Sequence, residues 1–310
     1  MIVVVWQQLS IPIGQTEVDL LSEQLSELGA HAISIEDNGD QPIFEPPIDS
    51  HPLWPEVKLT ALFPPDTQLD SITQLTLAKF PSLHATDLSW TAIEDQAWHL
   101  SGREQFSTTR CGERTWICPS WETPPEDPDA VIVHLDPGVA FGTGAHATTK
   151  MCLTWLDENI QGNELLLDLG CGSGILSIAA LKLGAKQVYA VDIDQQAQQA
   201  TQANAQRNRV RDRLVITTIE DLPHHYFDIV AANILANTLI ELAPTLQTLL
   251  KPGGQLLLSG ILQSQQEEIL DCYAPKVLLS PYAAREEWIC LSGNVCTSSV
   301  ATRTCRKKTS

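Results

Sequence analysis

The chain has 310 residues, of which 43% are hydrophobic, and its formal net charge is −19 at pH 7. This length allows two domains of ordinary size, each with its own core. The negative charge repels polyanions and disfavours direct nucleic-acid binding, whereas a lysine-rich protein would be attracted. No stretch approaches the roughly 20 apolar residues of a membrane span, so we expect no membrane contact.

Cysteine usage and the N-terminus indicate the compartment. Eight cysteines form no CxxC pair and no metal-ligand spacing with histidine. In a chain of this size they indicate reduced, mostly buried thiols, and no metal site is expected. The N-terminal apolar run is too short for a signal peptide. We therefore expect a cytoplasmic protein; its oligomeric state is not defined by the sequence, and a monomer is favoured.

Residues 1–94 have the pattern of a ferredoxin-like domain. Strands are predicted at 2–9, 31–37, 56–63 and 84–93, and helices at 15–28 and 66–80. Two successive strand–helix–strand units are typical of this α+β fold. The segment carries fourteen acidic and two basic residues and lacks the aromatic run of an RNA-binding sheet. Its acidic surface is either a solvated face or a docking face for a basic protein.

The remainder of the chain is predicted to contain a connector, a larger domain and a tail. Residues 95–129 are polar, with four prolines after Ile117. Between residues 130 and 293, strands and helices alternate, which is typical of a doubly wound parallel sheet with a late extra strand. Residues 294–310 contain four basic and no acidic residues and show no periodicity, so we expect a disordered tail.

The stretch DLGCGSG (168–174) joins an apolar strand to a helix. Glycines at 170, 172 and 174 let a ligand approach the backbone, because glycine has no side chain and can adopt positive φ. Their G-x-G-x-G spacing differs from the G-x-G-x-x-G fingerprint of dinucleotide sites. Asp168 would repel a pyrophosphate but tolerates a sulfonium and an ammonium. The stretch therefore predicts a site for S-adenosylmethionine, with Asp168, Gly170, Gly172 and Gly174 around it.

Two strand ends complete this predicted site. Asp192 follows Gly170 by 22 residues and ends the next strand, where a carboxylate can accept both ribose hydroxyls. Asn233 ends the fourth strand, and its amide oxygen can accept a hydrogen bond from a substrate amine or belong to a simple turn. Ile234 and Leu235 replace the stacking prolines and aromatic of many amino-methyltransferases. This replacement disfavours a flat nucleobase as substrate, whereas an aliphatic amine is compatible with it.

Several other residues leave two interpretations open. His146 lies in the second glycine-rich stretch, DPGVAFGTGAHATTK (136–150), and is either a general base or a hydrogen-bond partner that orders the loop. Cys171 is expected to be a small residue in a tight turn rather than a nucleophile. Glu220 and Asp221 follow the third strand, where they either face the adenine or form a solvated turn.

The motifs DPGVAFGTGAHATT, DLGCGSGILSIAALKLGA, VDID and ANILANTL, with ERTWICPSW upstream and EEWICLSG near the end, closely resemble the ribosomal protein L11 methyltransferase family. The resemblance covers nearly the whole chain. It implies an α/β fold with a class I methyltransferase Rossmann-like sheet and a smaller ferredoxin-like domain. By matching motif, the resemblance implies cofactor contacts at Thr149, Gly170, Asp192 and Asn233, and a site lined by Phe141 and Thr143.

The same resemblance implies an activity. The enzyme would transfer methyl groups from S-adenosylmethionine to lysine side chains and to the N-terminal amine of ribosomal protein L11. The N-terminal domain would recognise this protein, and the connector would let the catalytic domain reach different amines. The alternative is a methyltransferase of another protein or of a small-molecule amine. A nicotinamide oxidoreductase is disfavoured by the glycine spacing, and a noncatalytic module would leave the cofactor site unused.

Overall fold

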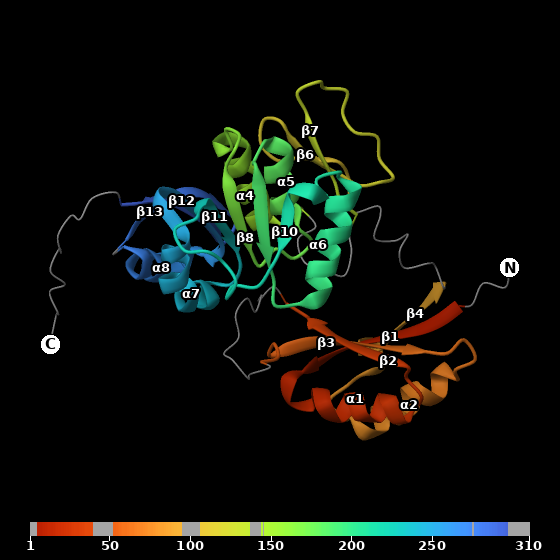
Figure 1. Ribbon diagram of the computed structural model, residues 1–310. Helices are drawn as coiled ribbons and strands as arrows, with labels where there is room; N and C mark the ends of the chain where they lie inside the picture. Colours follow the sequence, from red (N-terminus) through yellow and green to blue (C-terminus); the bar gives the residue numbers. More distant parts are fainter. Residues whose placement is uncertain are drawn as a thin grey trace, which may run out of the picture. The chain divides into compact units, whose positions relative to one another are not determined.

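The computed structural model describes residues 5–39, 52–94, 106–136, 144, 146–274 and 276–296. The chain divides into two compact units, Met1–Gly102 and Arg103–Ser310, and each unit has its own main sheet (Figure 1). Two predicted site residues, Phe141 and Thr143, and the tail from residue 297 onward lie outside the described residues.

The N-terminal unit is a four-stranded antiparallel sheet in the order β2-β3-β1-β4. Its strands are β1 (Val5–Gly14), β2 (Ala32–Asp37), β3 (Glu56–Phe63) and β4 (Ser89–Glu94). Two helices, α1 (Val18–Glu27) and α2 (Leu69–Lys79), cover one face of this sheet (Figure 1). This βαββαβ arrangement is the predicted ferredoxin-like fold.

The core of this unit follows from alternation along its strands. Leu9, Ile11 and Ile13 are buried against the helices, because alternate residues of a strand point to the same face. The prediction ended this strand at residue 9 and was too short. Pro12 pairs with Lys58 of β3, but β4 pairs with β1 only as far as Ser10, so residue 12 lies on an edge part of the strand, where proline is tolerated.

The second unit contains a seven-stranded sheet in the order β10-β9-β8-β11-β12-β14-β13. Its strands are β8 (Leu165–Leu169), β9 (Gln187–Val191), β10 (Leu214–Ile216), β11 (Phe227–Asn233), β12 (Leu250–Leu262), β13 (Val277–Arg285) and β14 (Trp288–Val295). All neighbouring pairs are parallel except those that β14 makes with β12 and β13. The predicted doubly wound sheet is confirmed, and its chain order reverses between β8 and β11. Ligands bind at such a switch point, outside the carboxyl ends of the strands.

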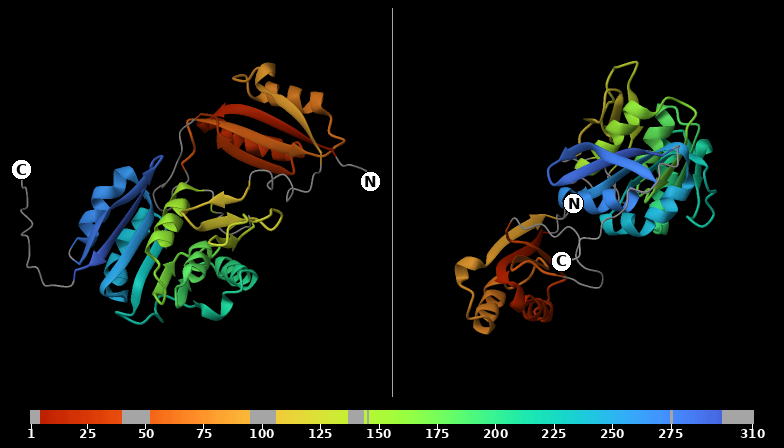
Figure 2. Two further views of the ribbon diagram at one scale, coloured as in Figure 1. Left: turned by 90° about the horizontal axis from the view of Figure 1, so that it is seen from above. Right: turned by 90° about the vertical axis from the view of Figure 1, so that its left-hand side faces the viewer.

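Helices cover both faces of this sheet (Figure 2). One face carries α4 (Ala147–Asn159), α5 (Ile175–Leu183) and α6 (Gln195–Arg207), and the other carries α7 (Ala236–Leu249) and α8 (Gln266–Tyr273). The central strands are therefore enclosed on both sides. Leu167 and Val230, from β8 and β11, are fully buried, as expected for strands of a parallel sheet.

The structure differs from the predicted connector. Residues 106–129 contain β5 (Thr109–Arg110) and β6 (Thr115–Cys118), which form a small sheet with β7 (Val131–His134) inside the second unit. Buried side chains on β6, including Thr115 and Cys118, attach this segment to the second unit. Because β5 and β6 are short, their strand pattern is weak, and the prolines and polar residues around them indicated a linker.

Three further segments differ from the sequence-based expectation. Helix α4 begins within the stretch that was expected to be a loop, and β13 was not predicted at all. β13 is an edge strand that contains Pro281, and few of its side chains are buried, so its apolar pattern is weak. β14 continues to Val295, two residues into the expected tail.

Three features of the described residues concern membrane spans, metal binding and the state of the cysteines. No helix there is long and apolar enough to cross a membrane. No group of three histidine, cysteine or acidic side chains in those ranges is arranged to hold a metal ion. The seven cysteines of the described residues are free thiols, and five of them are buried.

Candidate active site

The carboxyl ends of β8, β9 and β11 bring three predicted site residues to one edge of the sheet. Asp168 is the penultimate residue of β8, Asp192 follows β9 directly, and Asn233 ends β11. The parallel pairing of β8 with both neighbours places the three ends side by side. This edge lies at the point where the strand order reverses, so the polar groups converge where a ligand is expected.

The glycine turn between β8 and α5 requires glycine for its conformation and for its space. Gly170, Gly172 and Gly174 adopt φ values of +73°, +54° and +79°. A Cβ atom on Gly170 would lie 2.3 Å from Cγ2 of Ile234, and one on Gly174 would lie 2.8 Å from Cγ2 of Thr201. Both distances are shorter than real carbon contacts. The glycines are therefore required for the turn to pack against Ile234 and helix α6 without steric overlap.

Helix α6 supports this turn from the side. The Thr201 hydroxyl donates to the carbonyl oxygen of Gly172 at 2.9 Å, and the Asn204 side chain donates to that of Ser173 at 2.9 Å. The two donors are three residues apart and therefore lie on the same face of the helix. Backbone carbonyls of an irregular turn are satisfied in this way, which holds the turn in one conformation.

Asp168 is almost completely buried, with 1% of its surface exposed. Its Oδ2 accepts hydrogen bonds from the backbone N–H of Ser177 at 3.0 Å and from the Ser177 hydroxyl at 2.6 Å. Burial raises the pKa of Asp168 to about 6, although the two bonds from Ser177 lower it. A cation bound near this carboxylate would favour its ionised form.

Asp192 is held by backbone donors on both of its oxygens. Oδ2 accepts from the N–H of Gly172 at 2.9 Å, and Oδ1 accepts from the N–H of Asp194 at 3.0 Å. The carboxylate is therefore fixed against the glycine turn. The next residue, Ile193, is fully exposed, an unusual state for a large aliphatic side chain and one that sequence reasoning did not single out.

Helix α4 delivers a further predicted residue to the end of β11. The Asn233 amide nitrogen donates to Oγ1 of Thr149 at 3.4 Å, and Thr149 is completely buried. Because the amide donates through its nitrogen, its oxygen points away from Thr149 and is the group that can accept from a ligand. Residues 84 positions apart in the sequence thus meet at the end of β11.

His146 caps helix α4. Its Nδ1 lies 2.7 Å from the Thr148 hydroxyl and accepts from the Thr148 backbone N–H at 3.4 Å. The imidazole ring also packs edge-to-face on Trp288, with 5.2 Å between ring centroids. These contacts match the ordering interpretation of His146. A catalytic role for this residue stays a prediction.

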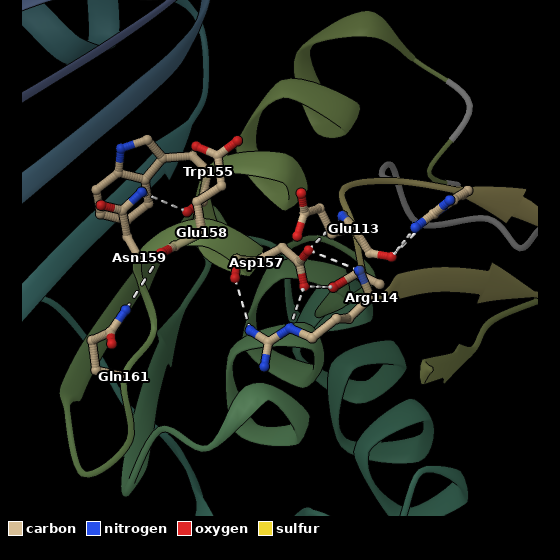
Figure 3. A network of polar contacts seen from close by, with 9 residues as sticks. Glu113, Arg114, Trp155, Asp157, Glu158, Asn159 and Gln161 are labelled. Carbon is tan, nitrogen blue, oxygen red and sulfur yellow. Dashed lines mark hydrogen bonds and ion pairs between the residues drawn. The ribbon is translucent and has the colours of Figure 1, made fainter. Parts of the chain in front are cut away.

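The opposite end of α4 is fixed by a polar network around Asp157 (Figure 3). Its Oδ2 accepts from the backbone N–H groups of Glu113 at 2.6 Å and of Arg114 at 2.9 Å, and its Oδ1 accepts from the Thr115 hydroxyl at 2.9 Å. The Arg114 side chain donates to the Asp157 carbonyl at 2.8 Å. Asp157 therefore binds the turn between β5 and β6 to α4, and it was not recognised from the sequence.

The structure describes the surroundings of Cys171 and Asp221, whose roles the sequence left open. Burial raises the pKa of the Cys171 thiol to about 12, and its sulfur lies 3.3 Å from the Thr201 hydroxyl oxygen. A thiol in this state is a poor nucleophile, as expected for a packing residue. Asp221 is exposed and accepts from the Thr218 hydroxyl at 2.9 Å, which is a local turn contact.

A seven-stranded sheet of this order, with a glycine turn after its first strand and a fixed carboxylate after its second, defines a class I methyltransferase. The site fits S-adenosylmethionine, which is the methyl donor of this class. Asp168 and Asp192 flank its glycine turn, and these carboxylates would repel a diphosphate but suit a ligand with two positive charges.

Comparison with known proteins identifies the family. Residues 5–295 match the family "Ribosomal protein L11 methyltransferase (PrmA)", to which the chain belongs. Ribosomal protein L11 methyltransferase of Shewanella woodyi is 47% identical over 291 residues, with 93% of this chain and 98% of that protein covered. The one from Cellvibrio japonicus is 44% identical over 290 residues, covering 93% and 97%. The predicted resemblance is confirmed.

A solved structure supports the same assignment. The crystal structure of a ribosomal protein L11 methylase from Lactobacillus delbrueckii subsp. bulgaricus is 32% identical to this chain, with a TM-score of 0.57. The match covers 62% of this chain and all of that one. The chain is therefore an S-adenosylmethionine-dependent methyltransferase with the fold of this family.

Proposed function

We propose that the protein methylates lysine side-chain amines and the N-terminal amine of ribosomal protein L11. The family match over residues 5–295 carries this proposal. The sequence at the end of β11 supports it, because Asn233 is followed by two aliphatic residues and not by an aromatic one. Residues 234 and 235 are isoleucine and leucine, which suit an aliphatic amine better than a flat base.

The cofactor contacts follow from the groups at the sheet edge. Asp192 would accept the two ribose hydroxyls, since backbone donors already fix the orientation of its carboxylate. The exposed side chain of Ile193 would cover the adenine ring. Gly170, Gly172 and Gly174 would admit the methionine part, with Asp168 compensating its positive charge. Thr149 would touch the cofactor from α4.

Asn233 would align the reacting amine. S-adenosylmethionine supplies a methyl group on a sulfonium, and this group transfers by in-line displacement to a nitrogen lone pair. The contribution of the protein is therefore mainly orientation. The Asn233 oxygen would accept an N–H of the amine and so aim its lone pair. Thr149 contacts the amide nitrogen, and the N-cap at His146 and the polar contacts of Asp157 hold α4, which carries Thr149.

The amine must be neutral to react, whereas a free lysine has a pKa of about 10.4. Removing the amine from water lowers its pKa because the charged form loses hydration. Leu235, which follows Asn233 by two residues and is 49% exposed, would offer an apolar rim for this purpose. We assign no general base, since the cap contacts of His146 account for its position.

Intact-protein mass spectrometry tests the proposal. Purified enzyme with S-adenosylmethionine should add methyl groups to ribosomal protein L11, and peptide mapping should place them on lysines and the N-terminus. An unmodified L11 under conditions in which the enzyme binds S-adenosylmethionine would overturn the substrate assignment. Methylation of another protein, or of a small amine, in the same assay would then establish the alternative.

The expected setting completes the proposal. We infer that the reaction takes place in the cytoplasm, where ribosomal proteins are made, and that the enzyme acts as a monomer. Its charge of −19 favours encounter with a basic protein substrate over direct contact with nucleic acid. Neither a nucleic-acid partner nor a membrane partner is required by this reaction.

A further inference from the structure

A buried amide lies at the end of helix α6. Asn208 directly follows the last residue of α6 and is 5% exposed. Its Oδ1 accepts from the backbone N–H of His134 at 2.8 Å, and its Nδ2 donates to the carbonyl oxygen of His134 at 2.7 Å. Nδ2 also donates to the carbonyl oxygen of Asn204 at 2.9 Å. These three bonds hold the amide in one orientation.

The partner of this amide is the end of strand β7. β7 is an outer strand of the described three-stranded sheet, in which it pairs with β6. The backbone N–H groups of Val131 and Leu135 donate toward β6. Bonding groups alternate along a strand, so the N–H and C=O of His134 point to the open side. The Asn208 amide therefore satisfies them as a further strand would.

The stripe of α6 that ends at Asn208 begins at the glycine turn. Thr201, Asn204 and Asn208 are separated by three and four residues and so lie on one face of the helix. The first two side chains donate to the carbonyl oxygens of Gly172 and Ser173. Asn208 lies seven residues, about 10 Å along the helix axis, beyond Thr201. A continuous polar connection thus runs from the glycine turn through α6 to β7.

An ion pair extends this connection by two residues. The Arg207 guanidinium pairs with Asp136, whose other oxygen accepts from the backbone N–H of Ser120 at 2.7 Å. Asp136 is the first residue of the second glycine-rich stretch (136–150). The residues that lead into this stretch are thus fixed to the helix that also fixes the glycine turn.

The connection supplies a direction that apolar packing does not. β7 lies outside the seven-stranded sheet, so strand pairing gives it no register relative to β8 and the glycine turn. β7 packs against α5, but apolar packing is not directional. Hydrogen bonds depend on distance and angle. The bonds of Asn208 therefore define where the second stretch begins relative to the turn.

We propose that Asn208 is a positioning residue for the binding of S-adenosylmethionine. Through α6, it sets the start of the second glycine-rich stretch against the turn that would hold the cofactor. Asn208 itself would not touch the cofactor. The proposal rests on the cofactor contacts of the proposed function, since it assumes that both stretches border one ligand.

Calorimetry of the full-length enzyme with S-adenosylmethionine tests this role. Asn208→Leu is similar in size but leaves the N–H and C=O of His134 without partners. It should raise Kd for the cofactor about tenfold, the order expected for unpaired buried groups. Asn208→Gln keeps the amide and should raise Kd only about twofold to threefold. At saturating cofactor, kcat for L11 should stay within about twofold, because Asn233 and Thr149 are unchanged.

Gln247→Leu is the matched control for a lost buried amide. Gln247 lies on α7, is 7% exposed, and donates to the Cys272 carbonyl oxygen at 3.5 Å. Its replacement should lower the free energy of unfolding but leave Kd for the cofactor within about twofold of the wild type. Chemical denaturation of both leucine variants shows whether their losses of stability are comparable.

A milder pair of variants covers the case in which Asn208→Leu does not fold. Arg207→Gln removes the ion pair with Asp136 and should raise Kd about threefold. Lys251→Gln removes the ion pair with Asp228, which is also partly exposed, and should leave Kd unchanged. The comparison separates the loss of this connection from the loss of any surface ion pair.

A double variant shows whether Asn208 acts through α6. Asn204→Ala removes the side chain that holds Ser173, so it interrupts the connection at the other end. In this background, Asn208→Leu should raise Kd less than about threefold. A tenfold rise both with and without Asn204 would mean that the two residues act independently, and would overturn the connection.

Each remaining outcome also decides one question. If Asn208→Leu and Arg207→Gln bind the cofactor as the wild type does, the positioning role is overturned while the proposed function stands. An equal rise of Kd in Gln247→Leu overturns it too, because lost stability is then the cause. If the wild type binds no S-adenosylmethionine, the proposed cofactor contacts fail and this inference fails with them. If it binds the cofactor but leaves L11 unmodified, the substrate assignment fails, and the Kd values still decide the role of Asn208.

Discussion

The cofactor edge of the second unit and the helical layer of the N-terminal unit both present carboxylates, but in different physical states. Asp168 is buried and bonded twice to Ser177, whereas Glu23 and Glu27 are exposed without an ion-pair partner in the described residues. A buried carboxylate acts individually, because its environment fixes its geometry and its pKa. Exposed carboxylates act as a group, and salt weakens each of them. At the cofactor edge, binding should therefore depend on the position of each carboxylate. At the helical layer, it should depend on their total charge.

The largest expected effect tests positioning at Asn233. Asn233→Ala removes the group that aligns the amine and should lower kcat about 100-fold or more, as expected when orientation is lost. The affinity for S-adenosylmethionine should change much less. Steady-state methylation of L11 and calorimetry with the cofactor measure the two quantities.

Asn159 provides the control for this variant. It lies at the other end of α4, where its side chain donates to the Trp155 carbonyl at 2.9 Å. Asn159→Ala should keep kcat within about twofold, because ordinary surface substitutions have small effects. A normal kcat in Asn233→Ala would contradict the alignment role.

A smaller effect is expected from the titration of Asp168. Its pKa of about 6 in the folded protein exceeds the ordinary value of 3.8, so the folded state binds more protons between these values. The free energy of unfolding should therefore decrease as pH rises from about 4 to about 6, by roughly 3 kcal/mol for this group. Other carboxylates also titrate in this range. The quantity to measure is thus the difference in the free energy of unfolding between the wild type and Asp168→Asn.

Asparagine is a suitable reference because it is neutral and its oxygen can still accept from Ser177. Chemical denaturation at several pH values should show the wild type losing stability relative to Asp168→Asn as the pH rises. A difference that does not vary with pH would refute the raised pKa. S-adenosylmethionine should bind the wild type more tightly above pH 6, where the carboxylate is ionised.

The smallest of these effects concerns the space around Gly170. Gly170→Ala places a Cβ 2.3 Å from Ile234 at φ +73°. In Gly184→Ala, at φ +120°, the nearest atom outside the adjoining residues is the Gly162 Cα, at 3.5 Å. Both variants carry the cost of positive φ, but only the first adds a steric overlap. We expect Gly170→Ala to be less stable than Gly184→Ala by about 2 kcal/mol. If both variants lose the same free energy of unfolding in urea denaturation, the Ile234 side chain moves aside without an energetic cost.

The local sequence pattern was sufficient to predict much of this structure. The alternation in residues 56–63 predicted β3 with its correct bounds, and the strand–glycine–helix order around residue 170 predicted the turn. The carboxylate after β9 and the amide after β11 could also be predicted, since the ends of parallel strands share one edge. These features depend on residues that are close in the sequence.

Features that depend on distant partners were missed. β1 continues through Pro12 beyond its pairing with β4, which begins only at Ser89, opposite Ser10. Residues 113–115 are held by Asp157, more than forty positions away. Thr201 was visible as a polar residue in α6, but its role depends on the carbonyl of Gly172. Ile193 is informative through its exposure, which no local pattern reveals.

Ile234 is enclosed by two glycines that are ninety positions apart. A Cβ on Gly170 would meet its side chain, and a Cβ on Gly260 would lie 2.4 Å from its carbonyl oxygen. Positions 170, 234 and 260 therefore cannot diverge independently. A larger residue at 170 becomes acceptable only after position 234 has become smaller, whereas a side chain at 260 requires the backbone itself to shift. The order of mutations, and not only their identity, limits how this site can evolve.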